Sequence, residues 1–94
     1  MESFDFSSLP GGDLIRQGLE DLASERESEA ALLVLIGAPR LRTLGLDVPE
    51  TASSLPEHRL YGLLARSDPD SAHSRYNALI RRLVRFERAV ECVA

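Results

Sequence analysis

The feature that most constrains the fold is a run of seven apolar residues, Ala30 to Ile36. A helix built from this run has no polar side, so other elements must surround it. A buried strand is the competing interpretation, because short apolar runs do not separate the two structures. The alanines and leucines of the run, with Ser28 placed as an N-cap before Glu29, favour a helix. We therefore expect a central helix at residues 29–36.

The rest of the apolar composition points to the same class of fold. Hydrophobic residues make up 44% of the sequence, and leucine dominates them rather than β-branched or aromatic residues. A chain of 94 residues is long enough for one core. We predict a single all-α domain over residues 13–94, preceded by an irregular tail at residues 1–12. Phe4 and Phe6 of this tail are expected to dock on the core; the alternative is an arm that binds a partner.

Capping residues and helix breakers divide the domain into five predicted helices. Asp13 is the expected N-cap of the first helix, in which Gly18 lies within the apolar stripe and allows a close crossing by another helix. Gly37 is expected to end the central helix. The remaining three are a short helix at Pro39–Leu44 closed by Gly45, a helix from a capping box at residues 54–57 to Arg66, and a long helix at about residues 70–92.

The long last helix carries an apolar seam with alternating spacings of four and three residues. This spacing is typical of helices that pack against a partner along their length. The seam is either the side that faces the helix's own domain or half of a homodimer interface. Because a helix of about 35 Å is long for so small a domain, we predict a homodimer. The seam is centred on Tyr76, Leu79, Leu83, Phe86 and Val90.

Arginines collect on the same helix, away from the seam. All eleven cations of the chain are arginine; residues 31–94 hold nine of them against seven acids, whereas residues 1–30 hold eight acids and two arginines. The functional interpretation of the arginines is a surface for an acidic protein or for nucleic-acid phosphates. The alternative is an ordinary solvated face. At 100° per residue, Arg81, Arg85 and Arg88 fall opposite the seam, and Arg75 and Arg82 lie at one edge of it.

Residues suited to catalysis or metal binding are few. His58 and His73 are the only histidines, and the single cysteine, Cys92, excludes an internal disulfide. No serine or cysteine has a recognisable activating context, and no histidine and glutamate share the i, i+3 or i, i+4 spacing of metal ligands on a helix. We therefore predict no catalytic residue, no metal, no cofactor and no small-molecule ligand.

Two weaker patterns suggest nucleic-acid chemistry. Six residues separate Arg66 from His73, which resembles the arginine-to-histidine spacing of the HEPN ribonuclease superfamily. The resemblance covers two residues of 94 and implies a helical, often dimeric protein that cleaves RNA. The second pattern is a helix-turn-helix, with a turn at Gly37 and a recognition helix that presents Arg40 and Arg42 to DNA.

The function predicted from these observations is a non-catalytic interaction or regulatory module, homodimeric and bound to a protein partner. Nucleic-acid binding through the arginines is the alternative, and a HEPN-like ribonuclease is the second alternative. The chain starts without the basic and apolar segments of a signal peptide, and its longest apolar run is far below the roughly 20 residues of a membrane span. We therefore expect a cytoplasmic protein. Glu87, inside the apolar margin of the last helix, is expected to pair with Arg59 or Arg66.

Overall fold

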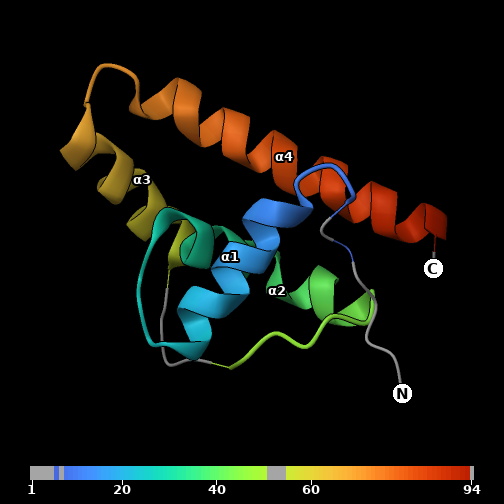
Figure 1. The fold of residues 1–94 in the computed structure, drawn as a ribbon. Helices are drawn as coiled ribbons and strands as arrows, with labels where there is room; N and C mark the ends of the chain where they lie inside the picture. The colour runs from blue at the N-terminus through green and yellow to red at the C-terminus, as the bar shows by residue number, and fades with distance from the viewer. Residues whose placement is uncertain (1–5, 7, 51–54, 94) are drawn as a thin grey trace.

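The computed structural model describes residue 6, residues 8–50 and residues 55–93. Within these ranges the chain is helical and contains no strand, which confirms the all-α prediction (Figure 1). The predicted number of five helices is wrong, because the described part of the chain forms four. They are α1 (Gly12–Ala23), α2 (Glu29–Thr43), α3 (Pro56–Ser67) and α4 (Ala72–Val93).

The missing break lies in the middle of α2, which continues through Gly37 and Pro39. Gly37 is buried where α4 crosses α2, and a Cβ there would lie 2.8 Å from Leu83 Cδ1. The glycine therefore serves the helix crossing and does not end the helix. Pro39 has no amide proton and so removes one backbone hydrogen bond from α2. Because Pro39 is exposed, this bond is lost on the solvent side of the helix and not in the core. Because no turn separates two helices here, the predicted helix-turn-helix is not formed.

The actual end of α2 is a turn in which Gly45 has a φ of 102°. The Gly45 amide donates to Arg42 O and the Leu46 amide donates to Leu41 O, both at 3.0 Å. This pair of bonds is the Schellman motif, which satisfies carbonyls that the last helical turn leaves free. The prediction that Gly45 closes this segment is confirmed.

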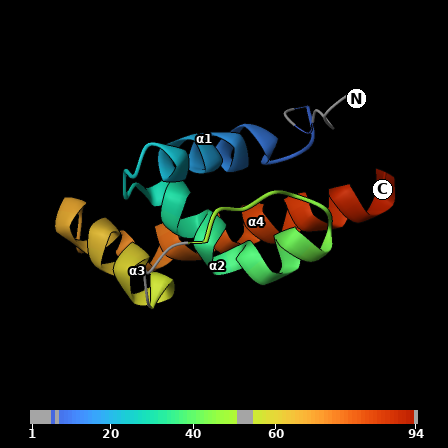
Figure 2. The ribbon, with the colours of Figure 1, turned by 90° about the horizontal axis from the view of Figure 1, so that it is seen from below.

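The position of α2 at the centre of the fold is confirmed. Leu32, Leu33, Val34 and Leu41 are each at most 1% exposed, and α1, α3 and α4 all contact α2. The predicted crossing at Gly18 is also present, because a Cβ on this residue would lie 2.4 Å from Ala30 O. Figures 1 and 2 show the long α4 running along one side of the other three helices.

The starts of the helices follow the predicted caps only in part. The Ala31 amide donates to Ser28 Oγ at 3.1 Å, so the predicted N-cap of α2 is confirmed. Asp13 is not the N-cap of α1; that residue is Gly11, with a φ of 77°. A Cβ on Gly11 would lie 3.0 Å from Arg82 O, so the close approach of α4 favours glycine at this cap. The N-cap of α3 is Leu55, with a φ of 54°, and not the predicted Ser54, which lies outside the described residues.

The connection between α1 and α2 is held by one buried carboxylate. Asp21 is 6% exposed and accepts hydrogen bonds from Gln17 Nε2 at 2.9 Å, Arg26 Nη2 at 2.9 Å and Ser28 Oγ at 2.5 Å. The hydrogen bond from Ser28 is the main cause of a lowered pKa for Asp21, and burial acts in the opposite direction. Because Ser28 also caps α2, this carboxylate links the end of α1 to the start of α2.

Phe6 docks on α4 through an aromatic contact. The ring of Phe6 meets the buried ring of Phe86 edge-on, with centroids 5.4 Å apart. This contact confirms the docking predicted for Phe6. Phe4 lies outside the described residues.

Candidate functional site

The predicted seam of α4 lies on its inner side. Leu83, Phe86 and Val90 are at most 4% exposed and belong to the same core as α2. Tyr76 and Leu79 are half-buried and pack against the edge of this core. The second half of the seam is therefore already covered by the chain's own residues and does not face a second copy.

The opposite side of α4 carries Arg81, Arg85 and Arg88, which we call the outer arginines. All three are exposed. None of their side chains forms an ion pair or a hydrogen bond with any other described residue. At 3.6 residues per turn, the side chains within about 70° of the centre of this side include no acid. They are Ser74, Asn77, Ala78, Val84 and Cys92. The nearest acid on α4, Glu91, lies just beyond them and is paired with Arg40.

The two arginines at the edge of the seam differ from the outer arginines in having partners. Arg75 Nη2 lies 3.2 Å from Glu29 Oε2 in the first turn of α2. Arg82 Nη2 lies 3.8 Å from Asp13 Oδ1 in the first turn of α1. The five arginines predicted as one surface therefore divide into two that join α4 to its own domain and three that do not.

Most arginines outside α4 also have hydrogen-bond or ion-pair partners. Of the six outside α4, five bind a carboxylate or a backbone carbonyl; the exception among the described residues is Arg66. The occupied ones are Arg16 with Glu20, Arg26 with Asp21, Arg40 with Glu91, Arg42 with the carbonyl of Val48, and Arg59 with Glu27. Against this pattern the three outer arginines are a concentrated group of unpaired cations.

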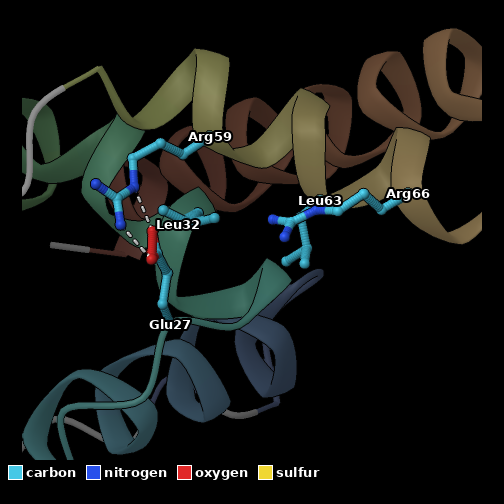
Figure 3. Close-up of a pocket in the computed structure, with 5 residues that line it drawn as sticks. All are labelled: Glu27, Leu32, Arg59, Leu63 and Arg66. Carbon is cyan, nitrogen blue, oxygen red and sulfur yellow. Dashed lines mark hydrogen bonds and ion pairs between the residues drawn. The ribbon is translucent and has the colours of Figure 1, made fainter.

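A separate hollow of about 230 Å³ lies where the α1–α2 connection meets α3, and sequence reasoning did not find it (Figure 3). Arg59 Nε and Nη2 donate to the two carboxylate oxygens of Glu27 on one side of the hollow. Arg66 extends from α3 toward the other side. Leu32 and Leu63 complete the lining.

The charges in this hollow act on one another. The hydrogen bond from Arg59 is the main cause of the lowered pKa of Glu27, burial opposes it, and the charge of Arg66 lowers the pKa further. The pKa of Arg59 is raised by the same hydrogen bond. Arg66 has no hydrogen bond or ion pair of its own to a described residue. The spacing of Arg59, Leu63 and Arg66 on one side of a helix is the signal that could have indicated this group.

Both partners predicted for Glu87 are wrong, because Arg59 binds Glu27 on a different part of the surface and the Arg66 side chain forms no ion pair with a described residue. Glu87 is half-buried where α4 crosses α2, with Oε2 3.3 Å from the point where a Cβ of Gly37 would lie. Burial raises the pKa of Glu87, the charge of Arg40 opposes this, and Glu91 adds to it. Arg40 itself is ion-paired with Glu91.

The structure does not bring Arg66 and His73 together. On α3, Arg66 shares the side of Arg59, whereas Tyr61 lies on the opposite side. The His73 ring lies beside Tyr61, with centroids 6.5 Å apart, and one of its nitrogens is 3.2 Å from Asn77 Nδ2. Tyr61 belongs to a second, shallower hollow of about 490 Å³ between α3 and α4, which it shares with Glu57, His58, Gly62 and Tyr76.

Comparison with known proteins adds no further evidence. No family model, curated protein or solved structure matches this chain. Among the described residues, no group of three or more histidine, cysteine or acidic side chains is placed to hold a metal ion. No described helix combines the length and the apolar composition that crossing a membrane requires. Functional inference therefore depends on the side chains of this chain alone.

Proposed function

We propose that the protein is a non-catalytic interaction module that binds an acidic segment of a protein partner through the outer arginines of α4. The single observation that carries this proposal is that three exposed arginines share one helix side without an acid. Arginine forks bind carboxylates with two parallel hydrogen bonds, which gives both affinity and orientation.

The geometry of α4 supports a helical or extended acidic segment. The outer arginines lie within eight residues, so the first and the last are about 10 Å apart along the helix. Glutamates spaced at i, i+4 and i+7 on a partner helix cover the same distance. Val84, which is 38% exposed beside the outer arginines, offers apolar contact to such a segment. We therefore expect the partner to carry three or more acids with a short apolar residue among them.

Nucleic acid is the alternative ligand for the same surface. A phosphate backbone would draw on Arg75 and Arg82 as well, but these two are already paired with acids of the chain. The net charge of −4 also works against binding a polyanion. The outer side of α4 carries no aromatic side chain on which bases could stack. These observations favour an acidic protein.

Fluorescence anisotropy distinguishes the two ligands. A labelled helical peptide with glutamates at i, i+4 and i+7 is compared with labelled DNA and RNA oligomers, at low salt and at about 0.15 M salt. We expect the peptide to bind and the triple variant R81Q/R85Q/R88Q to lose at least about tenfold in affinity. Arg16→Gln, which removes an exposed arginine of α1, serves as the control. Tighter binding of the oligomers, or equal binding by the triple variant, contradicts the proposal.

Self-association is a second part of the proposed function and needs a surface other than the buried half of the seam. Exposed or half-buried apolar side chains remain at Tyr61, Tyr76 and Val84. Sedimentation velocity at tens of micromolar protein measures it directly. A dimer that Tyr61→Asp dissociates supports a surface formed by Tyr61 and Tyr76, whose ring centroids lie 5.7 Å apart. A monomer throughout contradicts self-association.

A further inference from the structure

The hollow between the α1–α2 connection and α3 is lined by an unpaired cation and by apolar side chains. Arg66 extends toward it and has no ion-pair partner among the described residues (Figure 3). Leu63 lies three residues earlier on the same helix and is half-buried, and Leu32 of α2 also lines the hollow and is 1% exposed. A cation beside leucine side chains matches a ligand that has one anionic end and one aliphatic end.

The neighbouring ion pair sets the charge of that ligand. Glu27 and Arg59 neutralise each other through two hydrogen bonds. With Arg66 the lining carries a net charge of +1. A monoanion therefore brings the hollow to neutrality, whereas a dianion such as phosphate leaves an excess negative charge beside Glu27. The charge count selects a carboxylate over a phosphate.

We propose that this hollow binds a small aliphatic carboxylate, with the carboxylate on Arg66 and the aliphatic group against Leu63 and Leu32. The volume of about 230 Å³ is below the 300–1,000 Å³ typical of drug-sized ligands. It therefore suits one branched aliphatic group and its carboxylate. Two sources supply this chemistry, namely a free short-chain acid and the C-terminal residue of a peptide.

The binding is measured by NMR titration of the ¹⁵N-labelled full chain with isocaproate. We expect saturable shifts of the amides near residues 27, 32, 63 and 66. Isocaproamide has the same shape without the charge, and inorganic phosphate is an anion of higher average charge without the aliphatic group. Both are expected to bind at least about tenfold more weakly than isocaproate. Equal binding of either one, or the absence of saturable shifts, overturns the proposal.

Two substitutions test the roles of the charges. Arg66→Gln keeps most of the side-chain length and is expected to weaken isocaproate binding at least about tenfold. Glu27→Gln raises the net charge of the lining from +1 to +2 and frees Arg59, so phosphate is expected to bind this variant more tightly than the original chain. An unchanged affinity of Arg66→Gln for isocaproate contradicts the site. An unchanged preference in Glu27→Gln contradicts the charge argument.

A matched control separates this site from the proposed partner surface. Arg81→Gln also removes one exposed and unpaired arginine, but on the outer side of α4. It is expected to leave isocaproate binding within about twofold, whereas Arg66→Gln leaves binding of the acidic peptide unchanged. Loss of isocaproate binding in both variants would show that general charge, and not the hollow, holds the ligand.

The same titration distinguishes the two sources of the carboxylate. A peptide that ends in a free leucine carboxylate is compared with the same peptide amidated at its C-terminus. Tighter binding of the free peptide than of isocaproate, lost on amidation, identifies a peptide C-terminus. Weaker binding of the peptide identifies a free short-chain acid. Binding of both peptide forms with equal affinity contradicts recognition of the carboxylate.

Discussion

Helices α2 and α4 are both rich in leucine or other apolar residues, yet α2 is covered by the other helices whereas α4 has one exposed side. Along α2 apolar side chains face every direction, and α1, α3 and α4 cover it. Along α4 one side reaches the core with Leu83, Phe86 and Val90, and the other side exposes arginines without acidic partners. The comparison shows that α2 lies at the centre of the core, whereas α4 has one side in the core and one side exposed to solvent.

The largest effect on stability is expected from a substitution on the buried side of α4, compared with one on its exposed side. Phe86→Ala removes a fully buried ring that contacts Phe6, and we expect it to lower the free energy of unfolding by about 3–5 kcal/mol. Arg85→Ala, one residue earlier on the exposed side, is expected to change it by less than about 0.5 kcal/mol. Urea denaturation followed by circular dichroism measures both. Equal losses would mean that the outer side of α4 is covered.

The second prediction compares a glycine at a helix crossing with an exposed glycine. A Cβ on Gly18 would meet Ala30 O at 2.4 Å, whereas a Cβ on Gly62 meets nothing within 4 Å. We expect Gly18→Ala to destabilise the fold by about 1–3 kcal/mol through overpacking. Gly62→Ala is expected to stabilise it by about 0.5–1 kcal/mol, because alanine loses less backbone entropy in a helix.

Thermal and urea unfolding of these two variants, measured side by side, test the contrast. A stable Gly18→Ala protein would indicate that α1 can move away from α2 at little cost. In that case the close crossing would not be a requirement of the fold.

The surroundings of α2 explain why its central place was predictable and its length was not. An apolar run without a polar side must be buried in any helical arrangement, so local sequence was sufficient for Leu32, Leu33 and Val34. The role of Gly37 depends on Leu83, which comes from a helix far along the chain. Sequence position alone does not distinguish a glycine that ends a helix from one that allows another helix to approach.

The same limit applies to the charged residues. Helical periodicity placed Arg81, Arg85 and Arg88 opposite the seam, and the structure places them on the exposed side. The pair of Arg59 with Glu27 joins residues 32 positions apart, so no local pattern predicts it. The hollow therefore became visible only once the α1–α2 connection and α3 were seen together.

The third prediction concerns the carboxylate that ties α1 to α2. The pKa of Asp21 is lowered mainly by the hydrogen bond from Ser28. A lowered folded pKa means that the stabilisation is present above the unfolded value and is lost as the pH falls through the folded value. We expect Asp21→Asn to lower the free energy of unfolding at neutral pH. The variant should then lose less stability than the original chain as the pH falls. Unfolding midpoints from pH 7 down to about pH 2 measure this, and an unchanged acid limb contradicts it.

The smallest effect, with the opposite sign, is expected at Glu87, where α4 crosses α2. Burial raises its pKa, and Arg40 on α2 only partly offsets this because Glu91 on α4 pairs with the same arginine. A raised folded pKa means that the charged form is penalised above that value and that the penalty disappears below the unfolded value. Glu87→Gln is therefore expected to stabilise the protein at pH 7 by less than about 1 kcal/mol, since Glu87 is partly exposed.

The pH dependence of this variant separates burial from ion pairing as the dominant influence on Glu87. The advantage of Glu87→Gln should shrink as the pH is lowered and disappear below about pH 3, where the original carboxyl is almost entirely neutral in both states. Glu91→Gln is the matched control, because it removes a carboxylate one turn later that does bind Arg40, and it should destabilise slightly. If Glu87→Gln instead destabilises the protein at pH 7, attraction to Arg40 outweighs burial. The crossing of α4 over α2 would then be held by charge as well as by the close fit at Gly37.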